Sequence, residues 1–432
     1  MFRMRLIPTL VLPLVAILAC GDGEVGTATD SGLDAPDRVM VVAPEPVFAV
    51  GGFDAPDWAT FGDVSNVVFD DRGHLFVLDG QANIVTEIDA AGEFVRTIGR
   101  PGQGPGELSS PFAFTLTDEG GVAIFDLGHR GWVVYDSEGE FVGNVQVDMG
   151  EIGLPGSDVS PHPLGGAVGS VGGRIRMGGP GASSSDSEEE LAPSRPITYF
   201  ALSEADSSRV IYSAWDMPEA PEGEEQNLTT GGGGSIQLRM PVLRAFEPGL
   251  HASVLPDGRV AVVDSIGYRV KIVELDGTLA DVLERPIAPT EVTAGIQERE
   301  RDRRREEAAE GSGGGMVVMI GGGGNTQTQA GGMSEMMRAR IETMIFAEEI
   351  PVIERMAADP AGRIWVQRSS GTPGEAGPTD LLTTDGRYLG TLAPDALRIP
   401  SAFGPNGLMV RIEEDEFDVP TLVVERMPPE IG

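Results

Sequence analysis

The stretch Asp71-Arg72-Gly73-His74-Leu75-Phe76-Val77-Leu78-Asp79 joins a glycine turn to an alternating apolar strand. The same pattern returns in Asp118-x-Gly120-x-Val122-x-Ile124-x-Asp126. Four shorter copies contain the glycines Gly166, Gly258, Gly362 and Gly407. The pattern glycines are 47, 46 and 45 residues apart at 73/120, 120/166 and 362/407, and the wider gaps at 166/258 and 258/362 contain low-complexity insertions. This spacing indicates six copies of one structural unit.

The repeat predicts an all-β fold. A period of about 45 residues is typical of a four-stranded propeller blade, and a unit that cannot bury its own apolar face must stack on its neighbours. We therefore expect a six-bladed β-propeller over residues 37–428, with a partly helical insertion at 294–349 between blades four and five. Residues 38–49 form an apolar strand with no blade of its own. We expect it to complete the last blade, otherwise built from 402–410 and 421–426, because an open ring would expose a strand edge.

The amino terminus has the features of an export signal. Residues 1–5 are basic, and the apolar run at 6–19 is too short for a bilayer span of about 20 residues. Its end, Ile17-Leu18-Ala19-Cys20, resembles the lipobox of bacterial lipoproteins. We expect a signal peptide at 1–19, a lipid on Cys20 and a flexible tether at 20–36, which places the protein in the cell envelope, at the periplasmic or outer-membrane face. An ordinary secretory signal that contains a cysteine is the alternative.

Composition excludes some classes of partner and site. The net charge is -36, and the only lysine is Lys271, so the chain lacks the basic surface that nucleic acid or anionic lipid headgroups require. Cys20 is the one cysteine, which leaves no disulfide or thiol pair. The 60 glycines and 6% aromatic residues favour short strands with tight turns over a helical bundle. We expect a monomer.

Two insertions depart from the repeat. Residues 298–310 are a dense run of Arg and Glu with opposite charges four apart, such as Glu300 and Arg304, which predicts an exposed helix. After a glycine and glutamine linker at 311–332, apolar residues recur at helical spacing: Met333, Met336, Met337, Ile341, Met344 and Ile345. They predict the buried face of a helix, or else a lid that grips apolar ligands. The acidic stretch 183–190 in the other insertion predicts a disordered loop.

A family resemblance follows from the segment that joins the first two blades. Gly102-x-Gly104-Pro105-Gly106-Glu107-Leu108, after a Gly-x-Phe strand, resembles the crossing in NHL-repeat-like six-bladed β-propeller lipoproteins of bacteria. The likeness covers roughly residues 57–428 and is weakest at 174–238. Arg269 matches the arginine of the family's strand pair, whereas Ile84 and Gly131 stand at that position in blades one and two.

The chemical inventory of the sequence is small. Only four histidines occur, His74, His129, His162 and His251, and none has metal-ligand spacing to another. An aspartate at a strand end most commonly caps the next turn through backbone amides. If the loops at 79–83, 126–130 and 264–269 converge near the axis, they form a candidate ligand site. The predicted ligand-binding residues are Asp79, Asn83, Asp126, His129, Arg130, Asp264 and Arg269.

Three functions remain open from the sequence, of which one, an ion-shielded structural protein of the envelope with no small ligand, is distinguished only by finding a protein partner. The favoured interpretation is a non-enzymatic scaffold, without a cofactor, that binds an envelope protein, a peptide or a glycan through one face of the ring. The alternative is a metal-dependent hydrolase or lyase, which the resemblance implies through NHL-type amidating lyases and related calcium-dependent lactonases. That enzyme would hold Ca or Zn in the axial channel through aspartates and His129 or His251.

Overall fold

The computed structural model of the 432-residue chain describes the following residues: 32–149, 152–156, 158–173, 195–214, 225–229, 235–239, 242–310, 337–394, 396–415 and 417–428. The chain divides into a unit of residues 1–30 and a compact unit from residue 31 onward, which contains all the described residues. The signal peptide, Cys20, most of the tether and the acidic stretch 183–190 therefore lie outside the described residues. Across the described ranges, no helix has the length and apolar character needed to cross a membrane.

Six sheets form the blades, and each contains four consecutive antiparallel strands except where noted. Blade one consists of β3 (Val64–Phe69), β4 (Leu75–Asp79), β5 (Ile84–Ile88) and β6 (Phe94–Ile98). Blade two consists of β7 (Pro111–Leu116), β8 (Val122–Asp126), β9 (Gly131–Tyr135) and β10 (Phe141–Gln146). Blade three consists of β12 (Ser160–Pro161), β13 (Ala167–Gly173), β14 (Pro196–Phe200) and β15 (Arg209–Ser213), with β11 (Leu154–Pro155) also paired to β13.

The remaining blades have the same plan. Blade four consists of β19 (His251–Val254), β20 (Val260–Val263), β21 (Arg269–Val273) and β22 (Leu279–Glu284). Blade five consists of β26 (Ile353–Ala358), β27 (Arg363–Ser369), β28 (Ala376–Thr383) and β29 (Tyr388–Leu392). Blade six consists of β30 (Ala402–Phe403), β31 (Leu408–Glu414), β32 (Pro420–Arg426) and β2 (Glu45–Gly51), which comes from the amino-terminal end of the described chain. The predicted six-bladed β-propeller is confirmed.

The repeated phrase folds this way for two physical reasons. All six pattern glycines have a positive φ, between 71° at Gly166 and 87° at Gly258, a conformation that favours glycine over every other residue. The strand that follows is buried on both faces. In β4, Leu75 and Val77 pack against blade six, whereas Phe76 and Leu78 pack against blade two. Each such buried side chain contributes about 1.5–3 kcal/mol, so the energy that favours each strand comes from its neighbouring blades.

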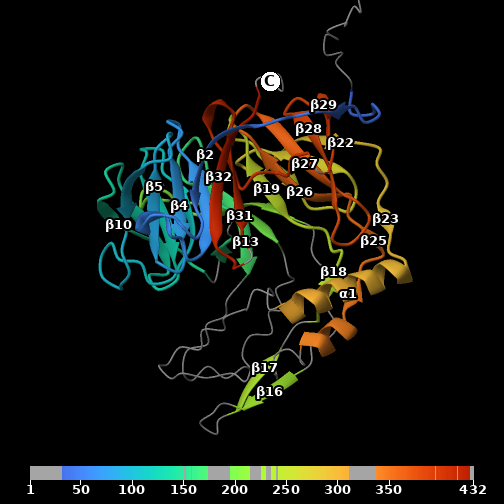
Figure 1. Cartoon of the computed structure of the whole chain (residues 1–432), viewed down its shortest axis with the longest axis horizontal. Coiled ribbons are helices and arrows are strands. Elements are labelled where there is room, and N and C mark those ends of the chain that lie inside the picture. Colours follow the sequence, from blue (N-terminus) through green and yellow to red (C-terminus); the bar gives the residue numbers. More distant parts are fainter. Residues whose placement is uncertain are drawn as a thin grey trace, which may run out of the picture. The chain divides into compact units, whose positions relative to one another are not determined.

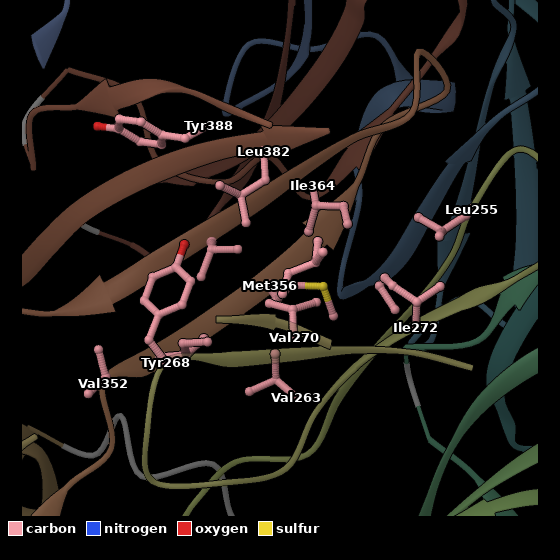
Figure 2. Packing of buried hydrophobic residues seen from close by; sticks show 14 residues of the cluster. Leu255, Val263, Tyr268, Val270, Ile272, Val352, Met356, Ile364, Leu382 and Tyr388 are labelled. Carbon is pink, nitrogen blue, oxygen red and sulfur yellow. The ribbon is translucent and has the colours of Figure 1, made fainter. Parts of the chain in front are cut away.

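The interface between blades four and five shows this packing directly (Figure 2). Val263, Val270 and Ile272 of blade four meet Met356 and Ile364 of blade five in one buried cluster. Around the ring, the first strands of the blades contact one another in the pairs β3 with β7, β7 with β12, β12 with β19, β19 with β26 and β30 with β3. These first strands therefore form the inner wall of the ring.

Ring closure uses the amino-terminal segment in two places (Figure 1). β2 pairs antiparallel with β32, from Glu45 opposite Arg426 to Gly51 opposite Thr421, so the prediction that this segment completes the last blade is confirmed. The prediction of one continuous strand over 38–49 is wrong. Its first part, β1 (Val39–Met40), pairs parallel with β29 of blade five, opposite Thr391 and Leu392.

The insertion between blades four and five contains the predicted helix, α1 (Ala294–Glu310). Arg304 binds Glu300 at 2.8 Å as expected, but the Glu300 side chain is buried beneath Arg303 and Arg304 rather than solvated. Short ribbons hold the base of the insertion: β23 (Thr290–Glu291) pairs with β25 (Glu349–Ile350), and β18 (Arg244–Ala245) pairs with β24 (Ile345–Phe346).

The apolar stripe after the linker is buried where the structure describes it. Ile341 and Met344 pack with Ala245, and Met337 lies at the edge of the same cluster. The prediction of a buried helix face is confirmed for Met337 and Ile341, which lie in the helical segment 337–342; it is wrong for Met344, which is buried beyond that segment, and for Ile345, which lies in β24, while Met333 and Met336 lie outside the described part of the chain. A hairpin of β16 (Glu225–Thr229) and β17 (Ser235–Arg239) belongs to the insertion between blades three and four. Two 3₁₀ turns, η1 (Asp57–Ala59) and η2 (Pro405–Gly407), complete the described elements.

Candidate functional site

Asp79 and Asp126 close the same structural motif in blades one and two. The carboxylate of Asp79 accepts the amides of Gly62 at 2.8 Å and Ala82 at 2.9 Å. The carboxylate of Asp126 accepts the amides of Ser109 at 2.7 Å and Ser110 at 2.9 Å. Each aspartate thus accepts hydrogen bonds both from the segment that enters its blade and from the turn after the second strand. Burial raises the pKa of Asp126, but these amide bonds outweigh burial and hold it below its ordinary value.

The other predicted residues of these two turns also have a structural role. Asn83 and Arg130 both have φ of 56°, so each supplies the left-handed residue of its turn. His129 donates its backbone amide to Asp126 at 3.0 Å, and its Nδ1 lies 3.0 Å from the same carboxylate oxygen. The turn-capping interpretation is therefore confirmed in both blades, and ligand binding by these residues stays a prediction.

Blade four differs, because Asp264 forms an ion pair in place of the turn cap. The Nζ of Lys271 lies 2.8 Å from Asp264 and 2.7 Å from the Tyr212 hydroxyl, which in turn donates to Asp264 at 3.0 Å. Burial lowers the pKa of Lys271, but these partners outweigh it and raise the pKa above its ordinary value. The last predicted residue, Arg269, binds Glu284 of β22 at 2.6 Å, and both side chains are about half exposed.

The metal alternative receives no support from these aspartates. The oxygens of Asp79 and Asp126 already accept several amide hydrogens, which a cation would have to displace. Within the ranges that the structure describes, no three His, Cys, Asp or Glu side chains are grouped as a metal site.

Charged side chains of the two neighbouring blades lie within electrostatic range of His251, which stands at the start of β19. Arg355 of β26, Asp158 before β12 and Arg195 before β14 all act electrostatically on the imidazole, as does the backbone of Glu354. The inner strands β12, β19 and β26 contact one another in this order, which places the cluster at one end of the inner wall. We call these residues the axial cluster: Asp158, Arg195, His251, Glu354 and Arg355.

The two titratable groups of the axial cluster favour their neutral forms. Burial lowers the pKa of His251, and the positive charge of Arg355 lowers it further. Burial raises the pKa of Glu354, although the charges of Arg355, Arg303 and Arg398 oppose that change. Glu354 and Arg355 are nevertheless exposed side chains, so a ligand can reach them. Perturbed groups in an accessible position are features of functional sites.

Backbone register explains why these two charges stand together. Three inner strands carry a bulge at the same place, between Val64 and Asn66, between Pro111 and Ala113, and between Ile353 and Arg355. The extra residue of the last bulge is Glu354, so two successive charged side chains become exposed there. Bulges of this kind commonly redirect a side chain beside a functional site.

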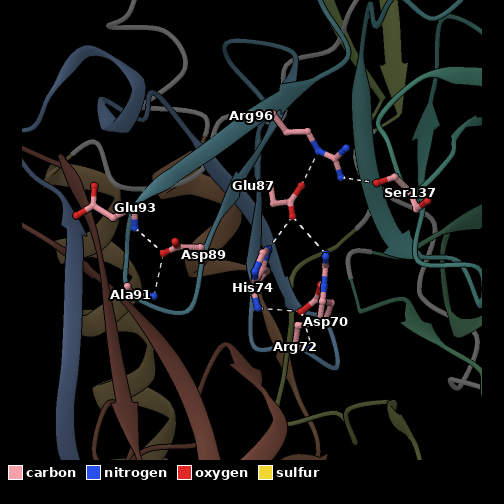
Figure 3. Close-up of polar contacts among 9 residues, drawn as sticks. All are labelled: Asp70, Arg72, His74, Glu87, Asp89, Ala91, Glu93, Arg96 and Ser137. Carbon is pink, nitrogen blue, oxygen red and sulfur yellow. Dashed lines mark hydrogen bonds and ion pairs between the residues drawn. The ribbon is translucent and has the colours of Figure 1, made fainter.

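A second polar cluster joins blades one and two (Figure 3). The carboxylate of Glu87, buried in β5, receives Arg96 at 2.6 Å and lies 2.8 Å from the Nδ1 of His74. Arg96 also donates to the carbonyl of Ser137 in blade two at 2.7 Å. Because Glu87 is buried and Arg96 joins it to Ser137, this cluster connects the two blades.

Comparisons with known proteins agree with this architecture. Residues 54–155 match a family described as "6-bladed beta-propeller". A search of curated proteins found no match. Similar solved structures include a candidate exported protein from Bacteroides fragilis, with 12% identity and a TM-score of 0.46 over 93% of this chain and 98% of that one.

Two further solved structures are enzymes. Virginiamycin B lyase from Staphylococcus aureus has 11% identity and a TM-score of 0.34 over 83% of this chain and 93% of that one. A gluconolactonase from Xanthomonas campestris has 10% identity and a TM-score of 0.36 over 91% of this chain and the whole of that one. The activities belong to the proteins named and are not transferred by likenesses of this size.

Proposed function

We propose that this chain is a lipid-anchored propeller of the cell envelope that acts as a binding module, with its site at the axial cluster. One observation carries the proposal: His251 and the charged groups that act on it come from three neighbouring blades, and two of those groups, Glu354 and Arg355, are exposed at the inner wall. Blades supply rigid positions, and a site assembled from several of them is pre-organised for a ligand.

The arginines of this region define the ligand class. Arg355 and Arg398 are exposed, and neither makes a hydrogen bond or ion pair with another described residue. Elsewhere in the ring, the partly exposed Arg259 and the exposed Arg387 each bind a carboxylate of their own turn. Exposed guanidinium groups without a carboxylate partner of their own favour a ligand that carries a carboxylate, such as an acidic peptide or an acidic glycan.

An enzymatic role is the second candidate, and the two perturbed pKa values favour it. A neutral imidazole can accept a proton, and a carboxyl group with a raised pKa can donate one. In this alternative His251 is the base and Glu354 the acid of a hydrolase or lyase. Participation of Ca or Zn stays a hypothesis in that alternative.

The proposal is tested by binding and by metal content on residues 32–432 purified without chelator. We expect the protein to bind carboxylated members of an array of peptides and oligosaccharides, and to lose that binding on Arg355→Gln. Arg387→Gln is the matched control, because this arginine is also exposed but is paired with Asp385 in a blade-five turn. Equal binding by both variants, or no carboxylated ligand at all, contradicts the proposal. A stoichiometric metal and turnover of a lactone or ester would favour the enzyme.

The anchor requires a separate test in the full-length chain. Radiolabelled palmitate should be incorporated in a bacterial host and should disappear on Cys20→Ser. Retention of the label in that variant would contradict lipid attachment at this residue.

A further inference from the structure

Residues 32–42 form a strap that crosses from blade four to the edge of blade five. We refer to this segment as the N-terminal strap. Its centre lies on Arg285, which follows β22 and whose side chain is 3% exposed. Arg285 donates to the carbonyls of Leu33 at 3.2 Å and Ala35 at 2.9 Å. One buried guanidinium therefore binds two backbone carbonyls of the turn at residues 33–35.

Two arginines also bind the one carboxylate of the strap that lies between them. Asp37 accepts Arg285 Nη2 at 3.1 Å on one oxygen and Arg368 Nη2 at 2.6 Å on the other. Burial alone raises the pKa of Asp37, but the bonds and charges of Arg368 and Arg285 together hold it below its ordinary value. The carboxylate is therefore bound as an anion.

The strap then continues as a strand on blade five. The amide of Arg38 donates to the Tyr388 hydroxyl at 2.9 Å, and the carbonyl of Arg38 accepts the amide of Thr391 at 2.8 Å. Val39 and Met40 extend this pairing as the parallel strand β1 on β29 (Figure 1). Addition of an extended segment to an open sheet edge is a common way in which proteins recognise peptides.

The receiving notch is built entirely from blades four and five. Asp380, fully buried in β28, accepts Arg285 at 2.6 Å and Thr391 at 2.6 Å. The Arg285 guanidinium also lies 4.2 Å from the ring centre of Tyr388, a cation–π contact. Since none of these contacts involves the strap, the guanidinium is already oriented before the strap arrives.

The strap is held by polar contacts together with a few apolar contacts along its length. The side chains of Val39 and Val41 are 69% and 94% exposed, whereas Met40 and Val42 pack in the blade-five region and Leu33 and Ala35 pack against the cluster between blades four and five. A segment bound through backbone pairing and one carboxylate can be replaced by any extended peptide with the same two features.

We propose that this notch is a recognition site for an extended peptide that carries an aspartate or glutamate, and that the strap is its resident ligand. A partner peptide and the strap then exclude each other. The strap has the advantage of covalent connection, which gives an effective concentration on the order of millimolar for a short linker. A partner must therefore bind more tightly or arrive when the strap is pulled away. The inference is independent of the axial cluster.

The experiment separates the strap from the ring without changing the notch. A protease site is placed between Ala43 and Pro44, the linker between β1 and β2, and the folded protein is cleaved there. The probe is a fluorescein-labelled peptide with the sequence of residues 32–42, and its binding is followed by fluorescence anisotropy. We expect binding to the cleaved ring, none to the intact chain, and at least tenfold weaker binding of the same peptide with Asp37→Asn.

Variants of the ring identify the notch. Arg368→Gln should weaken the probe at least tenfold, whereas the control Arg387→Gln should leave it unchanged, because Arg387 bonds only within the β28–β29 turn. If Arg368→Gln fails to fold, the peptide variant still tests the same contact on an unaltered ring. A cleaved ring that releases its strap but does not bind the probe overturns the proposal, as does a strap that never exchanges, or equal affinity for the two peptides.

Discussion

Glu87→Gln is the most informative substitution for the cohesion of the ring, because one buried carboxylate organises the contact between blades one and two. The substitution keeps the shape of the side chain and removes its charge. Glu87 accepts the 2.6 Å bond from Arg96, and Arg96 in turn donates to Ser137 in blade two at 2.7 Å. Loss of the charge therefore weakens the orientation of the arginine that joins the blades.

The magnitude follows from the exposure of the partners. A hydrogen bond to a charged group contributes about 1.5–3 kcal/mol, and more is lost when a buried partner remains unsatisfied. Glu87 is 2% exposed, but Arg96 is 26% exposed and can recover part of its hydration. We therefore expect Glu87→Gln to reduce the free energy of unfolding by about 2 kcal/mol. Combined with Arg96→Gln, it should show a coupling energy of about 1–2 kcal/mol.

The assay is urea unfolding of residues 32–432 at neutral pH, followed by tryptophan fluorescence. Arg259→Gln is the control, because its pair with Asp257 lies within one exposed turn and connects no blades. That variant should change the free energy of unfolding by less than about 0.5 kcal/mol. Additive effects of Glu87→Gln and Arg96→Gln, or a loss no larger than the control, would refute the idea that this pair joins the blades.

Three further predictions concern pH and the insertion. The folded state lowers the pKa of His251 below its ordinary 6.5, so the stability that comes from its neutral form is complete above pH 6.5 and is lost as pH falls. His251→Asn should therefore make the melting temperature depend less on pH below 6.5. An unchanged pH profile in that variant would contradict this. The pKa of Asp37 lies below its ordinary 3.8, so its contribution to strap docking is present above about pH 4 and is lost as pH falls through the folded-state value. Proteolysis of the strap should therefore increase in acid, and Asp37→Asn should show the increase already at pH 7; resistance of both would oppose it. Deletion of residues 298–332 should leave a cooperatively folded ring, because neighbouring blades supply the core, and a broad, non-cooperative transition would count against that view.

Much of the fold was predictable because the residues of the repeat are fixed by local physical requirements. The pattern glycine is required by a positive φ, and the apolar run after it is required by burial against a blade on each side. Both causes are local to the motif, so the sequence alone identifies six blades. The division of residues 38–49 between two blades was not predictable, because an apolar strand does not specify which open edge it will join. Only the contacts of Arg285 and Arg368 with the strap settle that choice.

The candidate site was less predictable because it depends on departures from the repeat. One position of the inner strand holds a different residue in each of four blades. It pairs with the residue just before the strand-end position of the second strand, where Asp79 and Asp126 stand in blades one and two. Its occupants are Asn66, Ala113, His251 and Arg355. A search for repeated residues passes over this position, since its side chain differs in every blade. The repeated aspartates were selected instead, and in blades one and two they stabilise the turns that every blade needs.

This contrast gives a physical rule for the ring. In blades one and two the strand-end position accepts equivalent backbone donors and holds an aspartate, Asp79 or Asp126, whereas Asp264 of blade four pairs with Lys271 instead. A position at the end of the inner wall faces a different neighbour in each blade and is free to vary in charge. The bulge that exposes Glu354 beside Arg355 is shared with blades one and two, yet only in blade five does it bring two charged side chains to the surface. Under the proposed function, substitutions at the varied inner positions should change ligand specificity, while substitutions at Asp79 and Asp126 should change stability first.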